Sequence, residues 1–387
     1  MKNRIKICIV LINRASFARV RFLLKELKKN KIFKLQIIIA SSAILNKYGA
    51  IEQVLKKDKL KIESKFFSHV SGENNETMTK SLGLLVIELA SIFSRIKPDI
   101  CLNIADRYET LAIGVAASYM NIFLVHLQGG ELTGSIDESV RHAVTKLSHL
   151  HLACTKKSKK RIIQMGENPK YVFNVGCPSI DLIKNINFSK KVLLNKYKYG
   201  VGHKVDITKP YLVCLLHPVT TESDQSNKIT VINTLEAIYK INIPCIWLWP
   251  NVDAGSNITS NAIRSFRERN KFNKINFYTN FEPDDFIKLI NNALCLVGNS
   301  SSGIREASYL SIPTVNIGSR QILRERGFNV IDTDNKLASI YQAIKLSIKN
   351  KKNIKKNLIY GNGNSSYKIV KIIKKIKLDT KKTFYDL

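Results

Sequence analysis

Residues 100–131 read ICLNIADRYETLAIGVAASYMNIFLVHLQGGE and contain one strand–helix–strand unit. Residues 100–104 form a short apolar run, residues 109–119 have the length and composition of a helix, and residues 122–127 form a second apolar run. Short, continuous apolar runs separated by a helix are typical of parallel strands that are buried on both faces. This stretch therefore predicts a parallel sheet with crossover helices.

The same alternation of short apolar runs and helix-like segments continues along the chain. It predicts an α/β protein with two doubly wound, Rossmann-like domains. We expect the first domain to span residues 1–177 and the second residues 178–365, followed by a C-terminal helix and basic tail, residues 366–387, whose apolar face is able to pack back on the first domain. The other expected strands are residues 5–12, 35–40, 149–153, 171–175, 211–216, 245–249, 275–278, 294–297 and 314–317. The other expected helices are residues 17–29, 77–95, 137–147, 157–164 and 367–376.

The composition indicates a globular protein with a strongly basic surface. Of the 387 residues, 44% are apolar and 24% are charged, which are ordinary values for a folded chain. Lys and Arg number 62 against 30 Asp and Glu, and the net charge of +32 attracts polyanions. The basic residues are spread along the chain without a zinc-finger spacing or an aromatic RNA-reading motif, so we expect no nucleic-acid partner. Polyanion binding remains an alternative, with residues 349–382 as its strongest candidate.

Cysteine usage and hydropathy favour a cytoplasmic location. The seven cysteines are scattered, odd in number and without a CxxC pair, which argues against a disulfide framework and a structural zinc site. No uncharged apolar run approaches the roughly 20 residues that cross a bilayer, so no membrane span is expected. Residues 5–12 are expected to form a buried strand rather than a signal peptide, because Lys6 interrupts them and no small-residue cleavage pattern follows.

The usual glycine motifs for nucleotide binding are missing. No G-x-G-x-x-G follows the first strand and no G-x-x-x-x-G-K occurs, so a nicotinamide enzyme or an NTPase is disfavoured. The best candidate for a phosphate site is the strand-to-helix turn at residues 296–303, LVGNSSSG. There, free backbone N–H groups and the hydroxyls of Ser300 and Ser301 would meet the positive end of a helix dipole. The alternative is that these serines merely cap the helix.

Three carboxylates follow predicted strands of the first domain. Asp106 follows residues 100–104, Glu131 follows a Gly-Gly pair, and Asp137 opens the next predicted helix. Each has a structural alternative, since Asp106 and Asp137 are good N-caps. Together, they make a cluster suited to proton transfer and to stabilising a developing cation.

Other polar residues at strand ends are candidates for substrate binding. His217 ends the first strand of the second domain, and a lone histidine there is as often structural as functional. Arg14 and Arg107 lie at other strand ends, where a guanidinium could grip a diphosphate or form an ordinary surface salt bridge. His149 and His151 share one face of a strand, but no third ligand joins them at metal-binding spacing, so no metal site is expected.

Several blocks of the sequence resemble one family. The chain resembles the hydrolysing UDP-N-acetylglucosamine 2-epimerases of sialic acid synthesis, in the same order from Asn13 to about Ser366. The two most specific blocks are residues 133–149, which contain a predicted helix, and the serine loop at residues 298–306. The blocks are DRYE (106–109), HLQGGE (126–131), TGSIDESVRHAVTKLSH (133–149), GCPS (176–179), HPVTTE (217–222), PNVDAGS (250–256), GNSSSGIRE (298–306) and GSRQ (318–321).

The resemblance implies a GT-B-like fold with an active site in the interdomain cleft. It implies conversion of UDP-N-acetylglucosamine and water to N-acetylmannosamine and UDP through a 2-acetamidoglucal, for nonulosonic acid biosynthesis. It further implies that the UDP-sugar is used without a metal or nicotinamide cofactor, and that the protein is a homodimer or homotetramer.

The resemblance also assigns residues. By position, Asp106, Glu131 and Asp137 match the catalytic carboxylates, without a decision on which one removes the C2 proton. Within the substrate site, Ser300 and Ser301 are expected on phosphate and Glu306 on ribose hydroxyls. The complete set of expected substrate contacts is Arg14, Arg107, Arg141, His217, Asn251, Ser300, Ser301, Glu306 and Arg320.

The sequence departs from relatives at three places. A hydroxyl contact is lost at Ala18, Gln128 stands where some relatives have Glu, and Asn280 where some have His. The sugar therefore stays open: the alternative substrates are UDP- or GDP-2,4-diacetamido-2,4,6-trideoxyglucose on the route to legionaminic acid. A GT-B glycosyltransferase is the alternative activity.

Overall fold

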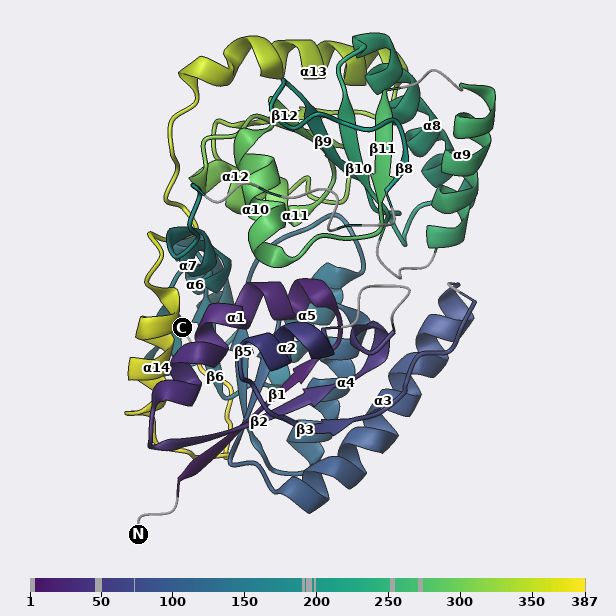
Figure 1. Ribbon diagram of the computed structural model, residues 1–387. Coiled ribbons are helices and arrows are strands. Elements are labelled where there is room, and N and C mark those ends of the chain that lie inside the picture. The colour runs from purple at the N-terminus through teal and green to yellow at the C-terminus, as the bar shows by residue number, and fades with distance from the viewer. Residues whose placement is uncertain are drawn as a thin grey trace. The chain divides into compact units, whose positions relative to one another are not determined.

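The computed structural model describes residues 4–45, 51–72, 74–189, 192, 197, 200–250, 255–270 and 274–386. The chain divides into two compact units (Figure 1). Unit 1 consists of Met1–Glu131, Asp137–Lys184 and Tyr360–Leu387, and unit 2 consists of Leu132–Ile136 and Asn185–Ile359. Each unit is built around its own seven-stranded sheet.

The sheet of unit 1 is parallel throughout, and its strand order is β3-β2-β1-β4-β5-β6-β7. From β1 to β3 the strands are added on one side of β1, and from β4 onwards they are added on the other side. The position between β1 and β4 is therefore the topological switch point, where open α/β sheets bind ligands. The strands are β1 (Ile5–Leu11), β2 (Phe33–Ile39), β3 (Ile62–Lys65), β4 (Ile100–Ile104), β5 (Phe123–Leu127), β6 (Leu150–Ala153) and β7 (Val172–Asn174). The helices are α1 (Arg14–Lys29), α2 (Glu52–Lys57), α3 (Asn75–Ile96), α4 (Tyr108–Tyr119), α5 (Asp137–Leu147), α6 (Lys156–Gln164), α7 (Pro178–Lys184) and α14 (Ser365–Ile373), with short 3₁₀ turns at Ser41–Ala43 and Pro169–Tyr171.

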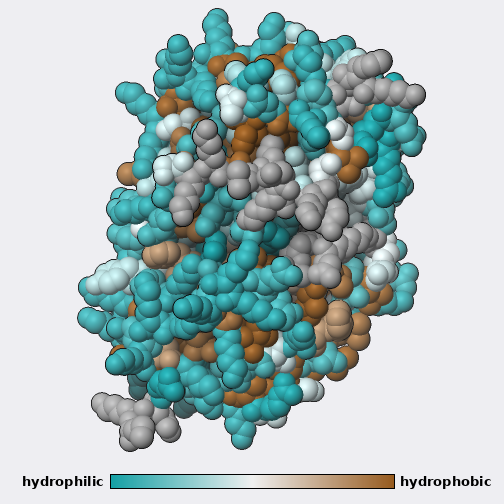
Figure 2. Space-filling view, viewed as in Figure 1, coloured by the Kyte–Doolittle hydropathy of each residue, from teal (hydrophilic) through white to brown (hydrophobic). Residues whose placement is uncertain are grey.

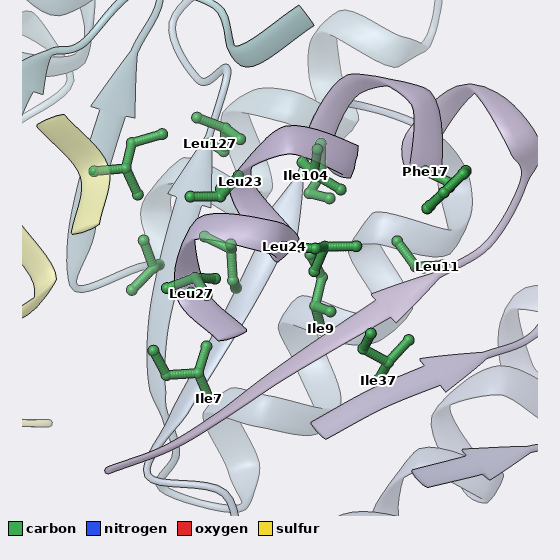
Figure 3. Close-up of a cluster of buried hydrophobic side chains, with 14 of the residues drawn as sticks. Ile7, Ile9, Leu11, Phe17, Leu23, Leu24, Leu27, Ile37, Ile104 and Leu127 are labelled. Atoms are coloured by element: carbon green, nitrogen blue, oxygen red, sulfur yellow. The ribbon is translucent and has the colours of Figure 1, made fainter. Parts of the chain in front are cut away.

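The core of unit 1 forms because its central strands are apolar on both faces. Alternate residues of a strand point to opposite faces. Accordingly, Ile7 and Ile9 belong to the buried cluster that holds Leu24 and Leu27 of α1 (Figure 3), whereas Cys8 belongs to a second cluster with residues of α3 and α4. Burial on both faces explains why the sequence of β1 is a continuous apolar run.

The chain leaves unit 1 after Lys184, whereas the sequence placed the boundary after Cys177. The reason is packing, because α7 lies against α1 and α14 and is buried over most of its length. The carboxylate of Asp181 in α7 is fully buried and accepts the backbone N–H groups of Ser365 at 2.9 Å and Ser366 at 2.5 Å. This carboxylate therefore caps α14, whose start at residue 365 agrees closely with the helix expected at residues 367–376.

The C-terminal segment returns to unit 1 at Tyr360, and the apolar face of α14 joins the core beside α1. Beyond α14, the strap, defined as residues 377–386, lies on the ends of α5 and α6. Tyr385 donates its backbone N–H to the Gly166 carbonyl at 3.0 Å, and the Thr380 carbonyl is 3.1 Å from Nε2 of His149. Part of the basic tail is thus hydrogen-bonded to the rest of unit 1.

Lys382 is the charged anchor of this strap. Its Nζ donates to the carbonyl oxygens of Lys146 at 2.7 Å and Ser148 at 2.6 Å, at the C-terminal end of α5. It also lies 2.7 Å from a carboxylate oxygen of Glu167, whose side chain is 3% exposed. Although burial opposes ionisation, His151 and the ammonium groups of Lys146 and Lys382 lower the pKa of Glu167 to about 2. Glu167 is therefore ionised at neutral pH and holds the strap by charge.

Unit 2 repeats the doubly wound plan, with the strand order β14-β13-β12-β9-β10-β11-β8. Only β8 is antiparallel to its neighbour, and the switch point lies between β9 and β12. The strands are β8 (Val201–Gly202), β9 (Leu212–Leu215), β10 (Cys245–Leu248), β11 (Ile275–Tyr278), β12 (Cys295–Gly298), β13 (Thr314–Ile317) and β14 (Val330–Thr333). The helices are α8 (Asp224–Ile241), α9 (Ser256–Arg269), α10 (Pro283–Asn292), α11 (Ser301–Ile304), α12 (Glu306–Tyr309) and α13 (Leu337–Asn350), with a 3₁₀ turn at Lys351–Asn353.

The prediction of two doubly wound α/β domains is confirmed, and the sequence missed three strands. β3 and β14 lie at sheet edges and are at most partly buried, and β8 has two exposed residues. Edge strands lack a continuous apolar run because they are not covered on both faces, so periodicity does not reveal them.

Helix α3 combines an apolar composition with partial exposure. Within the described ranges, it is the helix long and apolar enough to cross a membrane by length and composition alone, which supports a span only weakly. Leu85, Leu89 and Phe93 of α3 are buried in the core of unit 1, whereas Leu84 and Ile87 are exposed. The surface drawn in Figure 2 is mostly hydrophilic, with smaller hydrophobic patches.

We expect Lys382→Met to lower the free energy of unfolding by about 1–3 kcal/mol, because Glu167 and the last carbonyls of α5 lose a charged donor. Thermal unfolding at neutral pH measures the change. Lys381→Met is the matched control, since Lys381 is the exposed neighbour of Lys382 and its backbone N–H donates to Asp379. Equal melting temperatures for the two variants would contradict the role of Lys382.

Candidate active site

Polar residues of unit 1 gather at the carboxyl ends of three neighbouring strands. Arg14 follows β1, Asp106 follows β4, and Glu131 follows β5. Because these strands are parallel and adjacent, their carboxyl ends share one edge of the sheet. The chain turns sharply there, and two non-glycine residues adopt left-handed conformations: Ala105 has φ = 70° and Gln128 has φ = 72°. The structure therefore places Arg14, Asp106 and Glu131 at one edge of a parallel sheet, as expected from the pattern of apolar runs.

Arg141 connects the acidic residues at this edge. Its side chain is fully buried, and Nη2 lies 2.5 Å from Oδ2 of Asp106, whose side chain is 12% exposed. Nη1 donates to the backbone carbonyl of Glu131, also at 2.5 Å. Since the guanidinium is planar and permanently charged, it fixes both partners in direction as well as distance. The sequence expected Arg141 to bind substrate, whereas here it organises two acidic residues from within the protein.

Asp137 shares one face of α5 with Arg141. It is the first residue of the helix and half-buried, and Arg141 lies one turn further along. Residues four apart on a helix share a face. The buried Arg141 therefore places Asp137 on the face of α5 that carries the contact to Asp106. An acidic residue in the first turn also interacts favourably with the helix dipole.

Arg107 is engaged within unit 1. Its guanidinium donates from Nε to Oε2 of Glu109 at 3.0 Å and from Nη2 to Oε1 at 3.3 Å, and Oε1 of this buried carboxylate also accepts from Ser41 at 3.1 Å. The expected contact of Arg107 with substrate remains a prediction. A contact between Arg107 and substrate would therefore form beside the Arg107–Glu109 ion pair or would replace it.

In unit 2, Asn299 joins the ends of β9 and β12. Its Oδ1 accepts the backbone N–H of His217 at 2.8 Å, and its Nδ2 donates to the His217 carbonyl, also at 2.8 Å. The Asn299 carbonyl accepts from Arg320 at 3.1 Å and from Gln321 at 3.2 Å. Asn299 thereby holds His217 with its side-chain amide and Arg320 with its backbone carbonyl, and both are expected substrate contacts.

The serine loop, residues 298–306, begins at the end of β12 with a tight turn at Gly298, as expected for a phosphate-binding turn. Gly298 has φ = 131°, and a side chain there would meet the Leu215 carbonyl at 2.1 Å, so only glycine fits. Ser300 caps the short helix α11 by accepting the N–H of Ser302 at 3.3 Å, which is the structural role considered for these serines. Phosphate binding by Ser300 and Ser301 remains a prediction.

Glu306 offers an acceptor that the protein does not use. Its side chain is largely buried, and within the described part of the chain its Oε2 has no hydrogen-bond partner. A buried carboxylate oxygen left without a donor is costly, and a ligand hydroxyl would relieve that cost. Asn251, another expected contact, lies outside the described residues.

A cavity of about 250 Å³ opens in unit 2 beside the same loops. Its wall includes His217, Glu222, Asn299 and Gly318, which follow β9, β12 and β13. Unit 2 also contains Leu132–Ile136, and Gly134 in this stretch donates its N–H to the Arg320 carbonyl at 3.3 Å. Periodicity gave no sign that a stretch between Glu131 and Asp137 belongs to the other unit.

Among the described residues, no group of three or more His, Cys, Asp or Glu is arranged to hold a metal ion. The two histidines that shared a strand face have other partners. Nδ1 of His149 accepts the Leu124 N–H at 3.0 Å, and Nε2 of His151 is 2.9 Å from Glu167.

Two residues that hold the site in place are not predicted as such by the sequence. Asn299 is one residue of the polar turn at residues 296–303, and His126 is one residue of the motif at residues 126–131. Both are buried polar residues at strand ends, and that position was the available signal. Their partners lie far along the chain, so their roles required the structure.

Polar groups thus lie at the switch points of two doubly wound sheets, which is typical of α/β enzymes. The profile of the family described as UDP-N-acetylglucosamine 2-epimerase matches residues 25–374, and the chain belongs to this family.

Similar proteins support this assignment. The chain is 34% identical over 373 residues to a UDP-N,N'-diacetylbacillosamine 2-epimerase (hydrolyzing) of Legionella pneumophila, covering 96% of each chain. It is 27% identical to a UDP-N-acetylglucosamine 2-epimerase of Neisseria meningitidis, covering 86% of this chain and 84% of the relative. The crystal structure of the Methanocaldococcus jannaschii UDP-GlcNAc 2-epimerase in complex with UDP-GlcNAc and UDP is similar in fold, with a TM-score of 0.75 and 19% identity over 96% of this chain and 99% of that one.

We expect Asn299→Ala to lower the free energy of unfolding by about 1–3 kcal/mol, because the His217 N–H and carbonyl lose their buried partners. Chemical denaturation measures the loss. Asn292→Ala, at an exposed position at the end of α10, is the matched control. If both variants unfold at the same denaturant concentration, Asn299 does not hold the two strand ends together.

Proposed function

We propose that this protein is a hydrolysing 2-epimerase acting on a UDP-linked 2-acetamido sugar. The observation that carries the proposal is the buried Arg141, which holds Asp106 and the backbone of Glu131 at the edge of the unit 1 sheet. Support also comes from the family and from a relative named as hydrolyzing that is 34% identical over nearly the whole chain.

The reaction has two steps. In the first, the bond between C1 of the sugar and the UDP oxygen breaks, UDP leaves with the electron pair, and a base removes the C2 proton. The product is a 2-acetamidoglucal with a C1–C2 double bond. In the second step, water adds its hydroxyl to C1 and a proton is delivered to C2 on the face that inverts it. The products are UDP and the free 2-epimeric sugar.

The carboxylates of unit 1 have the properties that this chemistry needs. Asp106, Glu131 and Asp137 are proposed to stabilise positive charge at C1 and to move protons at C2 and at the added water. Asp106 is already held by a guanidinium, so its orientation costs little during the reaction.

Unit 2 is proposed to hold the nucleotide. Ser300 and Ser301 are assigned to phosphate, and the unused acceptor of Glu306 to a ribose hydroxyl. The other proposed contacts with the nucleotide sugar are made by His217, Arg320, Asn251, Arg14 and Arg107.

For the sugar, we place UDP-2,4-diacetamido-2,4,6-trideoxyglucose first and UDP-N-acetylglucosamine second. The relative named for diacetylbacillosamine is 34% identical over 96% of this chain, against 27% over 86% for the Neisseria relative named for UDP-N-acetylglucosamine. In either case, the product is a 2-acetamido sugar with inverted C2, which we place in cytoplasmic nonulosonic acid biosynthesis. Assembly as a homodimer or homotetramer remains a prediction.

Incubation with each nucleotide sugar, without an acceptor, is expected to release UDP and a free sugar inverted at C2. Proton NMR in D₂O follows both products and should show deuterium at C2. Release of UDP with retained C2 configuration, or no UDP from either UDP-linked candidate, contradicts the proposal. Turnover of the GDP-linked candidate alone, with release of GDP, contradicts the assignment of the nucleotide. A glycosyltransferase would instead require an acceptor for sugar transfer.

Asp106→Asn is expected to lower kcat by about 10²–10⁴-fold, because the amide neither carries negative charge nor accepts a proton. The amide keeps the shape of the carboxylate, but the buried guanidinium of Arg141 loses its countercharge, so the melting temperature should fall as well. The turnover number is therefore compared at a temperature at which both proteins are folded. Glu88→Gln, on the exposed face of α3, controls for the loss of one negative charge. A turnover number equal to that of the control removes Asp106 from the mechanism.

A further inference from the structure

His126 is a buried histidine of β5 that connects two elements of the site. Its side chain is inaccessible to solvent, its Nε2 lies 3.0 Å from the carbonyl oxygen of Ala105, and its Nδ1 lies 3.2 Å from Oγ1 of Thr145 in α5. Ala105 directly precedes Asp106. The imidazole thereby spans from the exit of β4 to the helix that carries Arg141.

The partners of the ring fix its protonation. A carbonyl oxygen only accepts hydrogen bonds, so Nε2 of His126 carries the proton and donates it to Ala105. Burial lowers the pKa of His126 to about 3, which leaves Nδ1 unprotonated at neutral pH. The one hydroxyl proton of Thr145 is shared between this Nδ1 at 3.2 Å and the Arg141 carbonyl at 3.0 Å. The ring is therefore neutral in a single tautomer, set by the groups on both sides.

Ala105 needs this support because its backbone is in an unfavourable region. Its φ of 70° is left-handed, which costs a non-glycine residue roughly 1 kcal/mol or more. Its N–H donates to the Leu127 carbonyl at 2.9 Å, and its own carbonyl is held by His126. Both peptide groups around Ala105 are thus fixed. The second of these groups leads into Asp106 and sets the direction from which its side chain starts.

The same ring of contacts closes through α5. Oγ1 of Thr145 is 3.0 Å from the Arg141 carbonyl, and the guanidinium of Arg141 binds Asp106. The packing around His126 is tight, since a Cβ on Gly129 would lie 2.8 Å from its Nδ1. This contact explains a glycine at position 129 without a left-handed backbone.

We propose that His126 is a positioning residue, which directs the Asp106 carboxylate by holding the Ala105 carbonyl and the Thr145 turn of α5. The proposal rests on the proposed function, in which Asp106 acts on the sugar. His126 itself exchanges no proton with the substrate, because both ring nitrogens are occupied by protein groups. Its removal should therefore lower kcat and leave nucleotide binding nearly unchanged.

Two substitutions at His126 separate positioning from simple packing. His126→Leu removes the donor to Ala105, whereas the side-chain amide of His126→Gln can replace it at nearly the same place. We expect kcat to fall about 10–100-fold in His126→Leu, since small misplacement of a catalytic group is costly, and to be largely recovered in His126→Gln. KM and the Kd for UDP should stay within about twofold of wild type in both.

The pH profile provides a readout that a proton-transfer role would move. His126→Gln should keep the wild-type shape of kcat against pH, because the neutral ring does not titrate in the working range. Loss of one limb of the profile would show proton transfer by His126 and overturn the proposal. His203→Leu, at an exposed position of unit 2, controls for loss of an imidazole.

Crystal structures of the two variants test the geometry independently of turnover. In His126→Leu, we expect Ala105 to leave the left-handed region and the Asp106–Arg141 contact to lengthen, while His126→Gln keeps both. An unchanged Ala105 and Asp106 in His126→Leu, or wild-type kcat, overturns the proposal. If the wild-type protein turns over no nucleotide sugar, the proposed function fails, but these structures still decide whether His126 positions Asp106.

Thr145→Val covers the case in which His126→Leu does not fold. Valine has the shape of threonine without the hydroxyl, so the link from His126 to α5 and the hydroxyl contact with the Arg141 carbonyl within α5 are removed. We expect kcat to fall by about 3–10-fold with unchanged KM, less than for His126→Leu because the Ala105 contact remains. Unchanged kcat in a folded Thr145→Val contradicts the part of the proposal that runs through α5.

Discussion

The contact between Arg141 and Asp106 is the constraint on which unit 1 depends. The guanidinium is wholly buried and the carboxylate nearly so. Removing one partner from a buried pair leaves an uncompensated charge, which is strongly destabilising. The remaining contacts of the site are arranged around this pair: the Glu131 carbonyl binds the same guanidinium, and the Ala105 carbonyl before Asp106 is held by His126. The charged pair therefore makes the acidic cluster part of the fold.

Both units solve the same structural problem with buried polar side chains. A parallel sheet ends in turns whose polar groups have no strand partner, and those groups must be satisfied or remain accessible to solvent. In unit 1, His126 and Arg141 satisfy them, and in unit 2 Asn299 pairs with both backbone groups of His217. The turns at these strand ends are thereby held by hydrogen bonds to buried side chains. Such fixed turns suit groups that must meet a substrate in a defined geometry.

The C-terminal segment makes unit 1 discontinuous in sequence. α14 completes the apolar core beside α1, and the strap continues to the far end of α5, where Lys382 meets the last carbonyls of the helix. The helix that carries Asp137 and Arg141 is thus held at its N-terminal part by the acidic cluster and at its C-terminal end by the strap. Part of the basic excess of the tail is used for this internal contact.

The sequence by itself determined the two sheets, most of their strands and the strand ends at which Arg14, Asp106, Glu131 and His217 lie. Local periodicity and chain order carry this information, because parallel strands that are buried on both faces need continuous apolar runs. Only the tertiary structure decided that Arg141 is a buried partner of Asp106, that Asn299 holds His217, and that residues 360–387 return to unit 1. The edge strands β3, β8 and β14 and the boundary of unit 1 after Lys184 were also decided only by the tertiary structure. Each depends on contacts between residues far apart in the chain, and no local pattern records which distant group a buried polar side chain will meet.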